Sequence, residues 1–242
     1  MLTFLLLALG GISLMTFLIF RTKEGGFLPA SLKLLTSFLF IATAVSAAVN
    51  NYIVTGIMTA EKFTFFGLII LGLIAGLVGD FTLDLKITYK DINIRHSDVY
   101  TYIGMASFGV GHILYIIAVA LFYGFSAWTI LIAVGATAAI FCVSIFLMKM
   151  NFGKFLIPSI LYAFLLTLFI SCTVAAGILI TFSLSIILLI VGSGLFLLSD
   201  LVLSMTYFDG NESRFMIITN HVLYYAAQFL IALSIYYTCL PF

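Results

Sequence analysis

The sequence predicts an all-α, polytopic membrane protein: eight transmembrane helices, built from two parallel four-helix repeats, surround a cavity that faces the cytoplasm. Of the 242 residues, 64% are hydrophobic and 8% are charged, whereas soluble domains carry roughly 25% charged residues. Eight apolar runs reach the length of about 20 residues that a bilayer-spanning helix needs. Short motifs also recur, in the same order, in the second half of the chain.

The expected helices cover residues 2–20, 29–49, 63–84, 99–123, 127–148, 155–176, 178–205 and 214–238. The first run has no basic start and no A-x-A-like cleavage site, so we expect a retained helix rather than a signal peptide. The break between the sixth and seventh helices rests on Gly177 alone. We expect a single transmembrane domain over residues 1–242, with repeat one at about 1–124 and repeat two at about 125–242.

Basic residues predict the orientation of the helices. The connections after the odd-numbered helices and their edges contain Arg21, Lys23, Lys86, Lys90, Arg95, Lys149, Lys154 and Arg214. The even-numbered connections contain only Lys62. By the positive-inside rule, the odd connections are cytoplasmic and both termini lie on the other side of a bacterial inner membrane or of the endoplasmic reticulum. The glycosylation sequon Asn211-Glu212-Ser213 would then face the cytoplasm and stay unused.

Three paired motifs indicate the internal repeat. The first pair is Asp80 and Asp200, each near the end of a helix. The second is P-x-x-L followed by a polar residue, which is Lys33 in one half and Tyr162 in the other. The third is H-x-L-Y-x-x-A, which begins at His112 and at His221. Because four is an even number, the two halves share one orientation in the membrane. Equivalent residues should therefore converge about an axis along the membrane normal.

Asp80 and Asp200 are the candidate catalytic residues. An ionised carboxylate that faces lipid costs roughly 2.5–3.5 kcal/mol, so such residues normally face a protein interior or a watery cavity. Two carboxylates in one low-dielectric pocket cannot both ionise cheaply, so one of them holds a proton that it can donate. The alternative is that each is hydrated at the membrane interface. Asp84, one turn further on, is interpreted only as a solvated helix end.

The remaining polar residues of the helices are candidates for substrate binding. They are Lys33, His112, Tyr115, Tyr162, His221, Tyr224, Tyr225 and Gln228. The four on the last helix share one face through their i, i+3, i+4, i+7 spacing. At 1.5 Å per residue, His221 lies about 10 Å and His112 about 20 Å from the cytoplasmic face. These residues would line a funnel, although snorkelling of Lys33 and hydrogen bonds between helices are the alternatives.

Other classes of site are less favoured by the sequence. A metal ion held by the two Asp and two His is an alternative, but the histidines lack H-x-x-x-H or H-E-x-x-H spacing, and neither metal nor cofactor is assigned. A net charge of +1 provides no extended basic surface for nucleic acid. Cys142, Cys172 and Cys239 form no CxxC pair and are interpreted as packing residues.

The ordered motifs resemble the YhhN-like lysoplasmalogenase family of multi-pass membrane proteins, over about residues 28–231. The matching residues are Lys33, Gly79-Asp80, Phe108-x-x-x-His112-x-x-Tyr115, Tyr162, Gly194-x-Phe196-x-x-Ser199-Asp200 and Tyr224-Tyr225-Ala226-Ala227-Gln228-x-Leu230-Ile231. The stretch from Leu201 to Phe208 is less typical of the family. The resemblance implies cleavage of the vinyl ether bond of lysoplasmalogens, to a fatty aldehyde and a glycerophospho-alcohol, with dependence on two Asp residues that correspond to Asp80 and Asp200.

The chemistry of a vinyl ether fits such a pair of carboxylates. Hydrolysis begins with protonation of the β-carbon, and water then captures the oxocarbenium ion, so an acid and a stabilising anion suffice. The expected partners are a lysophospholipid, water and membrane lipids; Lys33 would meet the phosphate, and the alkenyl chain would lie up the apolar interior. A transporter that uses the same polar cavity is the leading alternative. An intramembrane aspartyl protease is disfavoured, because Leu77-Val78-Gly79 precedes Asp80 instead of G-x-G.

Overall fold

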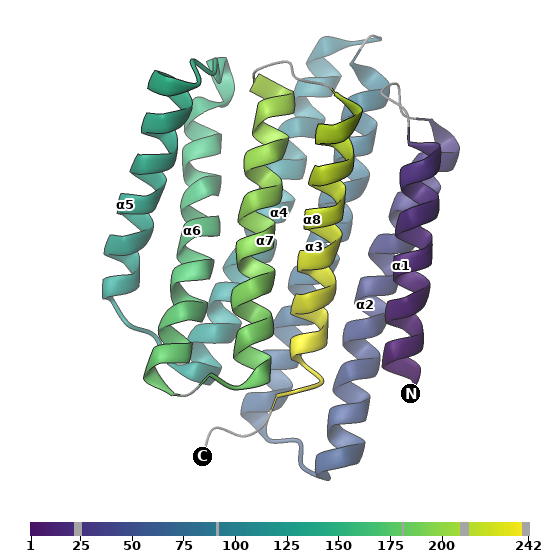
Figure 1. Cartoon of the computed structure of the whole chain (residues 1–242), viewed down its shortest axis with the longest axis vertical. Coiled ribbons are helices and arrows are strands. Elements are labelled where there is room, and N and C mark those ends of the chain that lie inside the picture. Colours follow the sequence, from purple (N-terminus) through teal and green to yellow (C-terminus); the bar gives the residue numbers. More distant parts are fainter. Residues whose placement is uncertain (22–25, 91, 181, 209–212, 239–242) are drawn as a thin grey trace.

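The computed structural model describes residues 1–21, 26–90, 92–180, 182–208 and 213–238, and all their regular elements are helices (Figure 1). The long helices are α1 (Leu2–Phe20), α2 (Phe27–Thr55), α3 (Ala60–Tyr89), α4 (Ile94–Tyr123), α5 (Trp128–Cys142), α6 (Leu156–Leu179), α7 (Leu184–Phe208) and α8 (Arg214–Ser234). A π-helical turn, Val143–Leu147, continues α5, and a 3₁₀ turn, Gly153–Phe155, precedes α6. Within the described residues, eight helices are long and apolar enough to span a membrane, which confirms the predicted class of integral, multi-pass membrane protein.

Several helix ends differ from the prediction by a few residues, and two of these differences change an interpretation. Gly177 lies inside α6, and the break before α7 comes after Leu179. A Cβ atom at Gly177 would lie 2.8 Å from the ring of Phe182, so this glycine makes room for an aromatic side chain and does not end the helix. Helix α3 continues to Tyr89 instead of ending near residue 84. The turn that follows ends at Asn93, whose side chain accepts hydrogen bonds from two amides at the start of α4, a common N-cap.

The helices pack as a bundle in which consecutive helices are neighbours, except α4 and α5. Helix α1 lies beside α2 at one edge, and α5 lies beside α6 at the other (Figure 1). Helix α2 also contacts α3 and α8, and α6 contacts α7 and α4 in the corresponding way. Among the described residues, α5 contacts no other long helix than α6. The two-repeat organisation stays a prediction. The contacts agree with it, because α3 and α8 beside α2 correspond, in the proposed repeats, to α7 and α4 beside α6.

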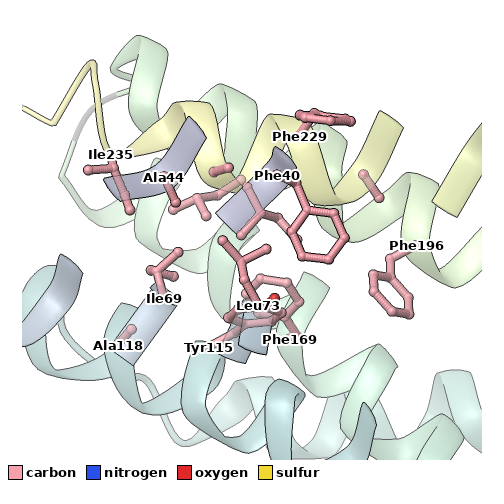
Figure 2. Close-up of a cluster of buried hydrophobic side chains, with 14 of the residues drawn as sticks. Phe40, Ala44, Ile69, Leu73, Tyr115, Ala118, Phe169, Phe196, Phe229 and Ile235 are labelled. Carbon is pink, nitrogen blue, oxygen red and sulfur yellow. The ribbon is translucent and has the colours of Figure 1, made fainter. Parts of the chain in front are cut away.

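Large side chains fill the middle of the bundle. Phe40, Leu73, Tyr115 and Phe169 come from four different helices and gather in one cluster (Figure 2). Glycine allows close approach, because a Cβ atom at Gly72 would lie 2.3 Å from the Tyr115 ring; small residues have this role at many membrane helix contacts. The interior is therefore tightly packed beyond the site described below.

The C-terminal ends of α1, α3, α5 and α7 lie together at one end of the bundle, which is uppermost in Figure 1. We call it the basic end, because its described residues include Arg21, Lys86, Lys90, Arg95, Lys149, Lys154 and Arg214. Which membrane face this end occupies stays a prediction. Lys23, Asn211, Glu212 and Cys239 lie outside the described residues.

Candidate active site

Asp80 lies inside the bundle with a complete set of partners. Its side chain is buried, and the residue is 2% exposed. One carboxylate oxygen accepts hydrogen bonds from the hydroxyls of Ser37, at 2.6 Å, and Tyr224, at 2.7 Å. The other oxygen lies 3.5 Å from the ammonium nitrogen of Lys33. A buried charge is tolerated when it is paired and hydrogen-bonded, so these contacts favour the ionised form of Asp80.

Lys33 joins two carboxylates on successive turns of α3. Its ammonium group donates to the main-chain oxygen of Asp80 at 3.1 Å and to Oδ1 of Asp84 at 3.2 Å. Lys33 is 4% exposed and Asp84 is 8% exposed. Lys33 therefore does not snorkel to the surface, and the interpretation of Asp84 as a solvated helix end is wrong. The prediction missed Asp84 because it placed the end of α3 at this residue, whereas the helix continues to Tyr89.

A chain of hydrogen bonds supports Asp80 from the side of α8. Tyr115 donates to the side-chain oxygen of Gln228, the amide of Gln228 donates to the Tyr224 hydroxyl, and each of these two distances is 3.1 Å. The Tyr224 hydroxyl then donates to Asp80. Tyr225 donates to the main-chain oxygen of Lys33 at 3.1 Å. These contacts fix the orientation of the groups around Asp80.

Asp200 has fewer partners and a different kind of neighbour. The Tyr162 hydroxyl donates to Oδ2 at 2.5 Å, and the Ser199 hydroxyl donates to Oδ1 at 3.4 Å. No ion pair to Asp200 occurs within the part of the chain that the structure describes. Among the described residues, Asp200 therefore has hydroxyl donors but no cationic partner.

The two candidate site histidines, His112 and His221, lie in separate aromatic surroundings. His112 has its Nδ1 2.8 Å from the main-chain oxygen of Phe108 and packs edge-on against Phe196, with ring centroids 4.5 Å apart. Its Nε2 is buried and has no hydrogen-bond partner. His221 has its Nδ1 2.7 Å from the main-chain oxygen of Ile217, and its ring packs against Phe17. A ring nitrogen that meets a carbonyl carries the proton, so Nε2 of His112 is an unused acceptor.

Both carboxylates line one cavity near the basic end, which we call the polar cavity. Its empty volume, including the open mouth, is about 1080 Å³, and its walls come from α2, α3, α4, α7, α8 and the end of α1. Along α3 and α7, Asp80 precedes Tyr89 by nine residues and Asp200 precedes Phe208 by eight, or about 14 and 12 Å of helix. The carboxylates therefore lie deeper than the last turns of their helices, where they were predicted.

A second, mostly apolar cavity adjoins the first. It has an empty volume of about 830 Å³ and lies among α4, α5, α6 and α7. Asp200, Phe108 and Tyr207 line both cavities. Because core side chains such as Leu73 fill the interior beyond the site, apolar space lies sideways toward α5 and not up the bundle axis as expected. Asp200 thus lies at the junction between a polar and an apolar space.

The predicted site residues fall into two groups. Those that line a cavity are Lys33, Asp80, Tyr162, Asp200, His221 and Tyr224. Those that lie behind the cavity walls and contact other site residues are His112, Tyr115, Tyr225 and Gln228. A direct substrate contact for the second group stays a prediction.

The sequence interpretation also missed several residues of the site. The mouth of the polar cavity contains Arg21, Lys86 and Lys90, which were used only to predict orientation. Ser37 and Asp84 contact the Asp80 and Lys33 pair. The sequence spacing could have identified Ser37 and Asp84. Lys33 and Ser37 are four residues apart, as are Asp80 and Asp84, so each pair lies on one helix face.

Eight membrane-spanning helices that enclose two carboxylates on one cavity define an integral membrane protein whose polar site lies within the bundle. The chain belongs to the YhhN family, whose family model matches residues 28–235 and so includes every predicted site residue. This family includes lysoplasmalogenases. Searches of curated proteins and of solved structures gave no significant match.

Proposed function

We propose that this protein is a lysoplasmalogenase. The reaction is hydrolysis of the vinyl ether bond of alkenyl-glycerophosphoethanolamine or alkenyl-glycerophosphocholine, which yields a fatty aldehyde and a glycerophospho-alcohol. Family membership supports this role at a coarse level. The observation that carries the proposal is the unequal pair of carboxylates, one ion-paired and one without an ion pair among the described residues, on a cavity that shares wall residues with an apolar cavity.

Asp200 is the proposed general acid. A carboxyl group without a cationic partner is more stable protonated when it is buried. Asp200 is partly buried, and its described partners are the hydroxyls of Tyr162 and Ser199 rather than a cation. In the first step, its proton passes to the β-carbon of the vinyl ether and leaves an oxocarbenium ion beside the new carboxylate.

Asp80 is the proposed anion that stabilises this cation. Its negative charge is maintained by Lys33 and by two hydroxyl donors before the reaction starts, so little reorganisation is needed when positive charge develops. Water then adds to the oxocarbenium ion and returns a proton to Asp200. The resulting hemiacetal collapses to aldehyde and alcohol, so the cycle consumes one water molecule and regenerates the acid.

The phosphate of the headgroup is proposed to bind at the mouth of the polar cavity. Lys33 was expected to have this role, but its ammonium group already contacts Asp80 and Asp84. Arg21, Lys86 and Lys90 line the same cavity nearer the basic end. Charge-assisted hydrogen bonds to phosphate are roughly twice as strong as neutral ones, so this cluster would hold the headgroup while the vinyl ether reaches Asp200.

Aldehyde release from the purified protein in detergent tests the proposal. We expect release from a lysoplasmalogen and none from the saturated ether analogue, because only the vinyl ether can be protonated at carbon. Release should persist in EDTA, since no step uses a metal ion. Substrate uptake into vesicles without aldehyde would instead support the transporter alternative and contradict the enzyme.

A further inference from the structure

The apolar cavity is built mainly from hydrocarbon side chains and has its polar groups at identifiable places. Met105, Ile140, Leu166 and Leu197 represent its apolar lining, contributed by α4, α5, α6 and α7. It shares Asp200, Phe108 and Tyr207 with the lining of the polar cavity. A ligand that reaches Asp200 from the polar cavity can therefore extend an apolar portion into this space.

The wall that α5 contributes to the apolar cavity ends in an unusual turn. Helix α5 contacts only α6 among the described long helices, so the cavity separates α5 from α7. In the π-helical turn Val143–Leu147, Ser144 alone is buried, and its side chain lines the cavity. Such turns occur frequently at functional sites. This turn presents a small side chain where a larger one would reduce the available space.

Ser159 supplies an independent sign of a ligand. This residue lines the apolar cavity and is 8% exposed, and its hydroxyl has no hydrogen-bond partner among the residues that the structure describes. It lies three residues before Tyr162 on α6, and so on the same helix face. Buried hydroxyls are normally paired, and an oxygen atom of a ligand bound close to Asp200 would provide the missing partner.

We infer that the apolar cavity binds the hydrocarbon chain of a single-chain lipid substrate and that Ser144 limits the length of chain that it accepts. The inference rests on the proposed function and specifies which part of the substrate lies where. Each methylene that leaves water strengthens binding by about fourfold. A cavity of this lining therefore favours long chains until the chain reaches the wall that contains Ser144.

Substitution of Ser144→Phe tests the inference against a matched control. The control is Leu147→Phe, in the same turn, where the side chain is 76% exposed and faces away from the cavity. The measurement is kcat/KM for lysoplasmalogens with chains of about 16 and about 8 carbons. Loss of space for two methylenes should lower the long-to-short ratio by about fifteenfold in Ser144→Phe, and Leu147→Phe should keep the wild-type ratio. Ala163→Leu, also in the cavity wall, provides a second variant in case Ser144→Phe does not fold.

A binding measurement separates this inference from the proposed function. Saturated lysoether lipids, which cannot be cleaved, should raise the thermal unfolding temperature of the wild-type protein more as their chains lengthen. The same lipids should lose this length dependence in Ser144→Phe or Ala163→Leu. If the unfolding temperature rises with chain length but no substrate releases aldehyde, the hydrocarbon-binding site is supported and the proposed hydrolase activity is contradicted. If aldehyde is released but both cavity variants keep the wild-type chain-length ratio within about twofold, less than one methylene, the inference is overturned.

Discussion

Asp80 and Asp200 occupy matching positions in the two halves of the chain, yet their neighbours carry different charge. Asp80 contacts a lysine, and Asp200 contacts a tyrosine. Lys33 and Tyr162 themselves occupy matching positions, since each follows a P-x-x-L motif at the start of its helix. One difference between two similar half-sequences thus provides a cation for one carboxylate and a neutral hydroxyl for the other.

The second difference concerns the space around each carboxylate. Asp80 is enclosed by hydrogen-bonded side chains from α2 and α8, whereas Asp200 borders both cavities. A reactive acid must meet the substrate, while a stabilising charge can act across a short distance. The comparison therefore supports two different proposed roles for a repeated motif, in which the surroundings, and not the Asp itself, would distinguish acid from anion.

Substitution of Asp200→Asn should have the largest effect. An amide cannot donate a proton to carbon, and general acid catalysis contributes about 10²–10⁴-fold, so kcat should fall by about a thousandfold. Aldehyde release under saturating lysoplasmalogen measures the change. Retention of more than about a tenth of the wild-type turnover would contradict the assignment of Asp200 as acid.

Asp80→Asn should lower kcat by a smaller factor, about a hundredfold, because it removes one preorganised charge but no proton donor. The fold should persist, since Lys33 keeps its contact with Asp84. Asp84→Asn is the matched control on the next turn and should cost less than about tenfold. Equal losses in the two variants, measured in the same aldehyde assay, would remove the special role of Asp80.

Tyr162→Phe tests the neutral partner of Asp200. The change deletes the hydroxyl that donates to Asp200 and leaves the ring, which packs against His112. One lost hydrogen bond to a carboxyl group, worth about 1.5 kcal/mol, should lower kcat by about tenfold with little change in KM. A change in KM alone would instead indicate that Tyr162 contributes only to substrate binding.

Lys86→Ala should have the smallest effect and should act on binding. Lys86 lines the mouth of the polar cavity, with its ammonium nitrogen 3.0 Å from the centre of the Tyr207 ring. Loss of one phosphate contact should raise KM by about fivefold at unchanged kcat, and added salt should reduce the difference. Lys149→Ala, an exposed residue of the basic end outside the cavity lining, is the control and should leave KM unchanged.

Local patterns predicted most of the helices but not all of their ends. The α1 boundaries follow from its apolar run and agree with the structure. Gly177 misled the prediction, because a glycine in a membrane helix can serve packing as well as termination. Asp84 was set aside because α3 continues beyond the apolar run, which a hydrophobicity pattern cannot show.

The sequence by itself determined the protein class and the number of apolar spans, and it identified Asp80 and Asp200 as carboxylates within apolar helices. Bilayer length, hydropathy and motif spacing are properties of short segments. Only the tertiary structure decided that Lys33 binds Asp80 and Asp84, that Asp200 has no cationic partner in the described part of the chain, and that an apolar cavity lies between α5 and α7. Each of these features depends on which helix faces meet across the bundle. Such contacts join residues far apart in the chain, so no local pattern specifies them.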